Sequence, residues 1–177
     1  MKALRTTEIK LVGAFFLVAG LFGFFTFISI ALPLVDLVSI LNLFPTLLFA
    51  LTLYSGYLLL LKENPKGLEI GRAVVALQII QFNIGGLTYV FFTGAYVTVG
   101  FVNLDFGMRF GLENTFQINL LDDTSNLVLH LNILALGIFI YLTKAINKIH
   151  DEEDMQEALE EEKSKREDSP VSYNKDR

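Results

Sequence analysis

The sequence contains no cysteine. Without a thiol, the chain can form no disulfide, no thiolate metal site and no thiol nucleophile. The four-helix thiol oxidoreductases of membranes are excluded for the same reason. The HExxH, GxSxG and Walker motifs of common hydrolases and nucleotide-binding proteins are also missing. These absences argue against an enzyme, a metal centre and a bound cofactor.

Acidic residues and arginine are absent from four long stretches, residues 11–32, 37–61, 73–94 and 126–146, and Lys144 is the only lysine inside them. A helix of about 20 apolar residues crosses the hydrocarbon core of a membrane. With 53% hydrophobic residues among 177, the chain is also more apolar than an ordinary soluble domain. We therefore predict an all-α integral membrane protein with four transmembrane helices.

The distribution of positive charge predicts the orientation. Thirteen of the fourteen Lys and Arg residues lie in the N-terminal segment, the 62–72 loop or the C-terminal segment, and Arg109 alone lies elsewhere. Because short cytoplasmic loops are enriched in Lys and Arg, both termini are expected in the cytoplasm. The first apolar stretch is about twice as long as a signal-peptide core and has no cleavage site after it. It is therefore interpreted as a retained helix.

The negative charge of the chain is concentrated at its end. The net charge is −5, and the segment from Asp151 onward holds eleven acidic and five basic residues. We predict a membrane domain over residues 1–149 and an acidic cytoplasmic tail over residues 150–177, helical at first and then disordered. No basic stripe suggests binding to nucleic acid.

Small residues indicate how the first two helices pack. Ala19 and Gly23 lie four residues apart in the first stretch, and Thr52 and Gly56 repeat this spacing in the second. Such pairs let helix backbones approach closely in lipid. The short connection between the two stretches predicts antiparallel neighbours.

Five polar residues inside the apolar stretches are candidates for a substrate path, namely Gln78, Gln81, Asn42, His130 and Asn132. The two glutamines are expected in the cytoplasmic half of the membrane, and the other three in the outer half. Intramembrane polar groups face protein or water. They could line a solute path, or they could form hydrogen bonds between helices, which is the commoner role.

His130 has a sharper interpretation and a plainer one. With Asp122 or Asp123 it could accept a proton or bind a metal. It could instead be an interfacial histidine that forms hydrogen bonds within the bundle. A single histidine without further ligands nearby favours the plainer role, and no metal site is predicted.

Residues 102–121 differ from the rest of the chain because apolar and polar residues alternate. Period 2 is typical of a strand with one buried face. A loop at 113–115 would pair Leu112 with Phe116 and Phe110 with Ile118. We therefore predict an extracytoplasmic β-hairpin between the third and fourth helices. Its apolar residues are candidates for a partner surface: Phe106, Met108, Phe110, Leu112, Phe116 and Ile118.

An isolated hairpin is marginally stable in water, so its apolar face must rest on another surface. That surface could be the protein's own helices, or it could belong to a partner that adds a strand. The features together predict a non-enzymatic structural or accessory subunit that binds another membrane protein or a further copy of itself. The alternative is a small-solute channel or transporter. A weaker third hypothesis is a membrane enzyme that uses His130.

The pattern of four spans resembles small four-span bacterial proteins in general. The resemblance implies location in the lipid bilayer of the bacterial cytoplasmic (inner) membrane, with several passes through it.

Overall fold

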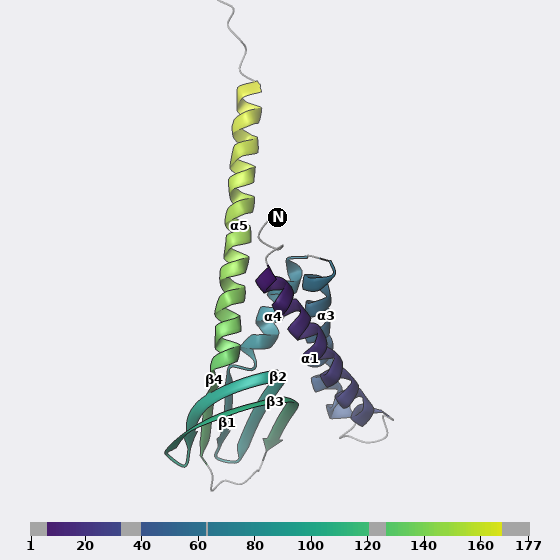
Figure 1. Cartoon of the computed structure of the whole chain (residues 1–177), viewed down its shortest axis with the longest axis vertical. Helices are drawn as coiled ribbons and strands as arrows, with labels where there is room; N and C mark the ends of the chain where they lie inside the picture. The colour runs from purple at the N-terminus through teal and green to yellow at the C-terminus, as the bar shows by residue number, and fades with distance from the viewer. Residues whose placement is uncertain (1–6, 33–39, 63, 121–126, 168–177) are drawn as a thin grey trace, which may run out of the picture.

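The computed structural model of this chain describes residues 7–32, 40–62, 64–120 and 127–167. Within these ranges three helices come first, four strands follow, and a long helix ends the described part (Figure 1). In chain order they are α1 (Thr7–Ala31), α3 (Leu43–Leu60), α4 (Lys66–Ala76), β1 (Ile80–Ile84), β2 (Leu87–Val102), β3 (Asp105–Leu120), β4 (Val128–Asn132) and α5 (Ile133–Glu167). The fold is therefore α+β, and the all-α prediction is wrong.

Helices α1 and α3 form a tightly packed antiparallel pair. Gly13 lies against Leu59 at one end of α1, and Gly20 lies against Leu53 near its middle. A Cβ atom on Gly20 would overlap the backbone of α3, so the two helix axes approach as closely as glycine allows. The first two predicted spans correspond to this pair.

The predicted third span, residues 73–94, is not a helix. Only its first residues belong to α4, which ends at Ala76, and the remainder forms β1 and the start of β2. Gly85 and Gly86 both have positive φ, at 60° and 86°. Two such residues form the tight turn that suits the twist of a two-stranded hairpin. The segment from Thr88 to Thr93 is rich in the β-branched and aromatic residues that favour strands.

The four strands form one antiparallel sheet in the order β1-β4-β2-β3. β2 is long enough to pair with two strands along one of its edges. Its first residues pair with β1 and its last with β4. Because β1 also pairs with β4, these three strands close a small ring. β3 lies outside that ring, along the full length of β2.

The predicted hairpin over 102–121 is also corrected. β3 runs without interruption through 113–115, and it pairs with β2 rather than with itself. The turn lies ten residues earlier, at Asn103 and Leu104, whose φ angles are 50° and 72°. The alternation of apolar and polar residues is real, but it belongs to one strand of a longer hairpin. Residue 121 lies outside the described residues.

The predicted fourth span, 126–146, begins as a strand. β4 occupies Val128–Asn132, and α5 starts at the next residue. The Oδ1 atom of Asn132 accepts a hydrogen bond from the backbone N–H of Ala135 at 3.2 Å, which caps the first turn of α5. α5 then continues through the acidic segment to Glu167. The disorder predicted for the end of the tail concerns residues outside the described ranges.

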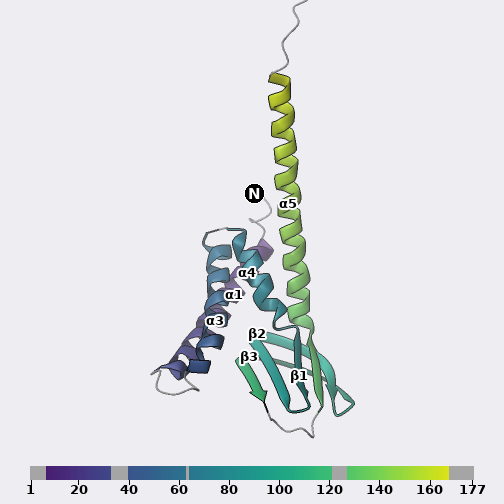
Figure 2. The same ribbon diagram turned by 180° about the vertical axis from the view of Figure 1, so that it is seen from behind.

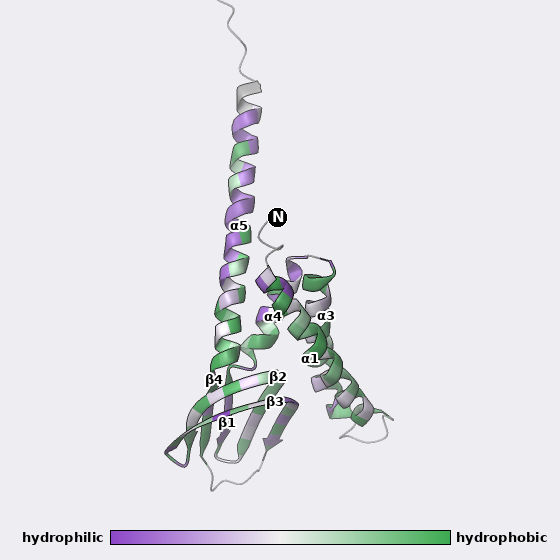
Figure 3. Cartoon of the chain, in the orientation of Figure 1, coloured by the Kyte–Doolittle hydropathy of each residue, from purple (hydrophilic) through white to green (hydrophobic). Residues whose placement is uncertain are grey.

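Among the described residues three helices, α1, α3 and α5, are long and apolar enough to cross a membrane, whereas four spans were predicted. In Figure 3, hydrophobic residues cover α1, α3 and the end of α5 nearest the sheet, whereas the far end of α5 is hydrophilic. Figure 2 shows the same arrangement from behind, with α4 between α3 and α5.

Two apolar clusters join these elements. In the first, Phe16 of α1 packs with Leu59 of α3 and Leu142 of α5. In the second, Phe49 of α3 packs with Phe91 of β2, with their ring centroids 5.7 Å apart. The second cluster fixes one face of the sheet against the helical pair.

Candidate interaction surface

Four of the five predicted polar residues come together where α4 leads into the sheet. Gln81 of β1 is the register partner of His130 of β4. The backbone N–H of Asn132 donates to the carbonyl of Ile79 at 2.7 Å. All four residues, Gln78, Gln81, His130 and Asn132, are buried. The glutamines were expected in the cytoplasmic half of the membrane, and His130 and Asn132 in the outer half. The four residues instead belong to one polar cluster within the ring.

Gln78 has a clear structural role in this cluster. Its Oε1 accepts hydrogen bonds from the backbone N–H of Thr93 at 3.0 Å and from the Thr93 hydroxyl at 3.1 Å. Thr93 lies in the part of β2 between the residues that pair with β1 and those that pair with β4. Gln78 therefore supplies the acceptor that a neighbouring strand would otherwise provide. The Nε2 of Gln81 in turn donates to the Gln78 carbonyl at 3.0 Å.

The cluster also contains polar atoms without a hydrogen-bond partner among the described residues, namely Gln78 Nε2, Gln81 Oε1, Asn83 Oδ1 and Thr98 Oγ1. These groups are neutral donors and acceptors, so the cluster is suited to small uncharged polar molecules rather than to ions.

The remaining predicted polar residue lies apart from the cluster. Asn42 precedes α3, where its carbonyl accepts hydrogen bonds from the amide and hydroxyl of Thr46. Asp122 and Asp123, the proposed partners of His130, lie outside the described residues. Across the described ranges no group of three His, Cys, Asp or Glu side chains could hold a metal ion. The solute path thus stays a prediction, and its five residues do not form one group.

The sheet has polar residues inside and apolar residues outside. On β4, Asn132 and His130 are buried, whereas Leu129 is exposed. Its register partners share this pattern, with Thr98 buried beside Asn132 and Phe101 exposed beside Leu129. Soluble sheets bury the apolar face, so this arrangement is inverted.

The predicted partner-surface residues all lie on one face of β3, because they occupy even-numbered positions along the strand. Phe110 and Leu112 have 78% and 81% of their side-chain surface exposed. We call the exposed set the β3 stripe: Phe106, Met108, Phe110, Leu112, Ile118 and Leu120. Leu120 continues the same alternation, although the predicted surface set does not include it.

Phe116 is the one predicted surface residue that the helices partly cover. Its ring packs edge-on against Phe44 of α3, with centroids 5.5 Å apart, and against Phe91 of β2 at 5.7 Å. The β3 stripe is therefore a continuation of the face that packs on the helices. It extends beyond the area that α1 and α3 cover.

β3 also has a free edge, since within the described residues it pairs only with β2. An edge strand presents unpaired N–H and C=O groups along its length. Short strands, bulges or a covering helix protect the edges of most sheets, but β3 is sixteen residues long and its stripe is exposed. The edge and the stripe together form the candidate interaction surface.

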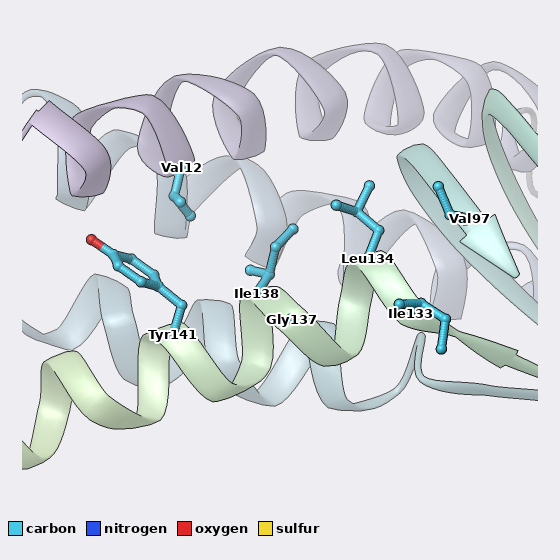
Figure 4. A pocket seen from close by; sticks show the side chains of 7 residues that line it. All are labelled: Val12, Val97, Ile133, Leu134, Gly137, Ile138 and Tyr141. Atoms are coloured by element: carbon cyan, nitrogen blue, oxygen red, sulfur yellow. The ribbon is translucent and has the colours of Figure 1, made fainter.

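Three cavities in the described part of the chain are mainly apolar. One of about 400 Å³ lies between the start of α1, β2 and α5, and Figure 4 shows Val12, Val97, Ile138 and Tyr141 around it. A second, of about 320 Å³, lies on the outside of the sheet beside Phe106. A third separates α1 from β2 and β3 near Gly94. Their linings suit lipid chains or apolar side chains better than polar substrates.

No protein-family model, curated protein or solved structure matches this chain.

Proposed function

We propose that this chain is a non-enzymatic integral membrane protein that binds another membrane protein through the free edge and stripe of β3. It is proposed to lie in the cytoplasmic (inner) membrane of a bacterium, with both termini in the cytoplasm. The helices α1, α3 and α5 would anchor it, and the sheet would form the docking module.

The length of α4 supports a membrane crossing that the sheet completes. Its eleven residues measure about 16 Å at helical rise, which is roughly half of the hydrocarbon core. Gly94 of β2 abuts Phe15 and Ala19 in the middle of α1. The sheet therefore lies beside the apolar part of α1, and α4 followed by the sheet replaces a third spanning helix. This keeps both termini on the same side.

The inverted sheet supports the same placement. Backbone groups in lipid must be satisfied within the protein, and closed pairing of strands achieves this. Transmembrane barrels likewise have polar residues inside and apolar residues outside. The ring of β1, β2 and β4 shares both properties on a small scale.

The free edge of β3 is the main support for a protein partner. Lipid chains could cover the apolar stripe, but they cannot form hydrogen bonds with the N–H and C=O groups of the edge. A partner protein can satisfy both needs, because an added strand pairs with the edge while its side chains pack beside the stripe.

The proposed placement can be tested with single cysteines, because the natural chain has none. In intact cells, a membrane-impermeant maleimide should label Q117C on the polar face of β3. It should label K66C at the start of α4 only after permeabilisation. Labelling of K66C from outside would contradict the orientation.

The docking proposal is tested by crosslinking in native membranes followed by native electrophoresis in mild detergent. A photoreactive residue at Leu112 should give covalent protein complexes. The same residue at Tyr54, which is exposed on α3, is the matched control and should give few. Isolated monomers in both assays would contradict the proposal.

A further inference from the structure

The turn at Asn103 and Leu104 determines which groups of β3 face its free edge. In a two-residue hairpin the residues flanking the turn exchange both backbone hydrogen bonds. Here those residues are Val102 and Asp105. Odd-numbered residues of β3 therefore bond to β2, and even-numbered residues direct their N–H and C=O groups to the edge. The even-numbered residues also carry the apolar stripe.

Two opposite charges lie symmetrically on the polar face of β3. Arg109 and Glu113 flank Gly111, two residues to either side. Four residues of strand separate them by about 13 Å, which is too far for an ion pair within β3. Both side chains are exposed, and neither has an ion-pair partner in the described part of the chain. The strand thus carries two complementary charges placed about a central glycine.

We propose that the occupant of the β3 edge is a second copy of this chain, paired antiparallel with Gly111 opposite Gly111. This inference rests on the proposed function and names the partner. Arg109 of each copy then lies opposite Glu113 of the other, so the pairing forms two cross-strand ion pairs. Opposite charges at directly facing positions stabilise antiparallel strands.

The backbone geometry fits this register. It places Phe110 opposite Leu112, and both are even-numbered residues whose N–H and C=O groups face the edge. The pairing at 109 and 113 falls on the alternate positions, where no backbone bonds form and facing Cα atoms are only about 4.5 Å apart. Charged side chains therefore meet at the closest positions, and glycine occupies the symmetry axis.

The register is also the longest that matches the charges. With Gly111 at the centre, residues 105–117 of the two strands overlap. A competing register centred on Gly107 would pair Arg109 with Asp105. It would overlap only over residues 105–109, because β3 begins at Asp105. The longer register satisfies more edge groups.

The two-fold axis of an antiparallel pair of identical strands is perpendicular to the sheet, and the same patch meets itself. Both copies therefore keep the face that carries Phe91 and Phe116 on the same side of the paired sheet. That face packs on α3 in each copy.

The register also brings the exposed end of one stripe beside the covered end of the other. Phe106 of one copy lies opposite Phe116 of its partner. Phe44 of α3 already contacts Phe116, and Phe44 and Leu47 are themselves exposed. The helical pair of each copy thereby offers apolar side chains to the exposed end of the other's stripe.

Site-directed disulfides test both the dimer and its register. In oxidised membranes G111C should form a disulfide-linked dimer, since facing Cα atoms at this kind of position suit disulfide geometry. The atoms nearest to the added side chain would be the hydroxyl and ring edge of Tyr96, at 2.7–2.9 Å from its Cβ, so the Tyr96 side chain must shift. Neither R109C nor E113C should crosslink alone, but co-expression of the two should give a mixed dimer. G107C is the matched control and should remain monomeric.

Each outcome has a distinct meaning. Crosslinking of G107C or of R109C alone would overturn the register. Absence of disulfides in G111C and in the mixed pair would overturn the second copy as partner. If native electrophoresis of that same membrane sample still showed a complex, the proposed function would stand with a different partner. If it showed only monomers, the proposed function would fail as well.

Charge exchange provides a test without cysteine. R109E places like charges opposite each other twice in the dimer and should weaken dimerisation about tenfold. E113R should have the same effect. The double variant R109E/E113R restores opposite charges at both positions and should dimerise as the wild type does. A double variant as weak as the single ones would overturn the ion pairs.

Discussion

The α1–α3 pair and the sheet both expose apolar side chains, but their interiors differ. Between α1 and α3 the interior consists of glycines against aliphatic and aromatic side chains. Thr52 is buried there, and its hydroxyl donates to the carbonyl of Leu48 in its own helix. Inside the sheet the interior is an amide and imidazole cluster, in which Gln78, before β1, accepts hydrogen bonds from Thr93 of β2. Close packing holds the first region together, and long-range hydrogen bonds hold the second.

The two regions satisfy their backbone hydrogen-bonding groups in different ways. A helix satisfies its own backbone, so a helical pair needs only surfaces that fit closely. A sheet must satisfy its backbone between strands, and three short pairings leave gaps that side chains such as Gln78 fill. We therefore expect the helical pair to be most sensitive to added volume and the sheet to the loss of polar groups.

The largest effect is expected from G20L, because its Cβ would overlap the backbone of Leu53 and force α1 and α3 apart. We expect a loss of more than about 3 kcal/mol in the free energy of unfolding. G137L in α5 is the control, since no atom lies within 4 Å of a Cβ built there. Equal losses in both variants, measured in mixed micelles, would contradict close packing as the cause.

A smaller loss is expected from G100V in the sheet. A Cβ at this position would overlap the carbonyl of Leu129 and approach the His130 Cα to 2.7 Å, so β2 and β4 would separate locally. We expect about 2 kcal/mol of destabilisation. G107V on β3 meets nothing within 4 Å and should be nearly neutral. A similar loss in G107V would assign the effect to glycine removal in general.

The next-largest effect compares the loss of one polar group inside the sheet with the loss of one between α1 and α3. Q78L leaves the backbone N–H of Thr93 without an acceptor and should cost about 1–3 kcal/mol. T52V removes a hydroxyl that bonds only within its own helix, and it should cost less than about 1 kcal/mol. Amide hydrogen exchange at Thr93 should accelerate in Q78L alone. Unchanged protection of Thr93 would contradict the role of Gln78.

The sequence predicted α1 and α3 because their apolar stretches carry no strong turn signal inside. The stretch 73–94 likewise contains no charged residue, but it has two glycines in succession and a run of β-branched and aromatic residues. These signals identify a hairpin, and the high hydropathy concealed them. A sheet that is apolar outside and surrounds uncharged polar residues can contain, like a spanning helix, a long stretch without charge.

The β3 alternation was recognised, but its turn was misplaced. A loop at 113–115 keeps the apolar residues on one face, and so does a turn at 103–104, so the pattern could not decide between them. The second choice needs a long strand over 87–102, and the predicted third helix includes residues 87–94 of it. Leu104 also gave no signal, because leucine rarely adopts the positive φ that it has here. The clustering of Gln78 with His130 follows only from the pairing of β1 with β4.

Because β4 passes directly into α5, a tilt of the sheet would also tilt the helix. No loop separates Asn132 from Ile133, and the Asn132 cap fixes the first turn of the helix. At about 1.5 Å per residue, thirty-five residues make a rod roughly 50 Å long. A tilt of about 10° in the sheet would move the acidic end of that rod by about 9 Å. A contact that tilted the sheet would thus displace negative charge at the opposite end of the molecule.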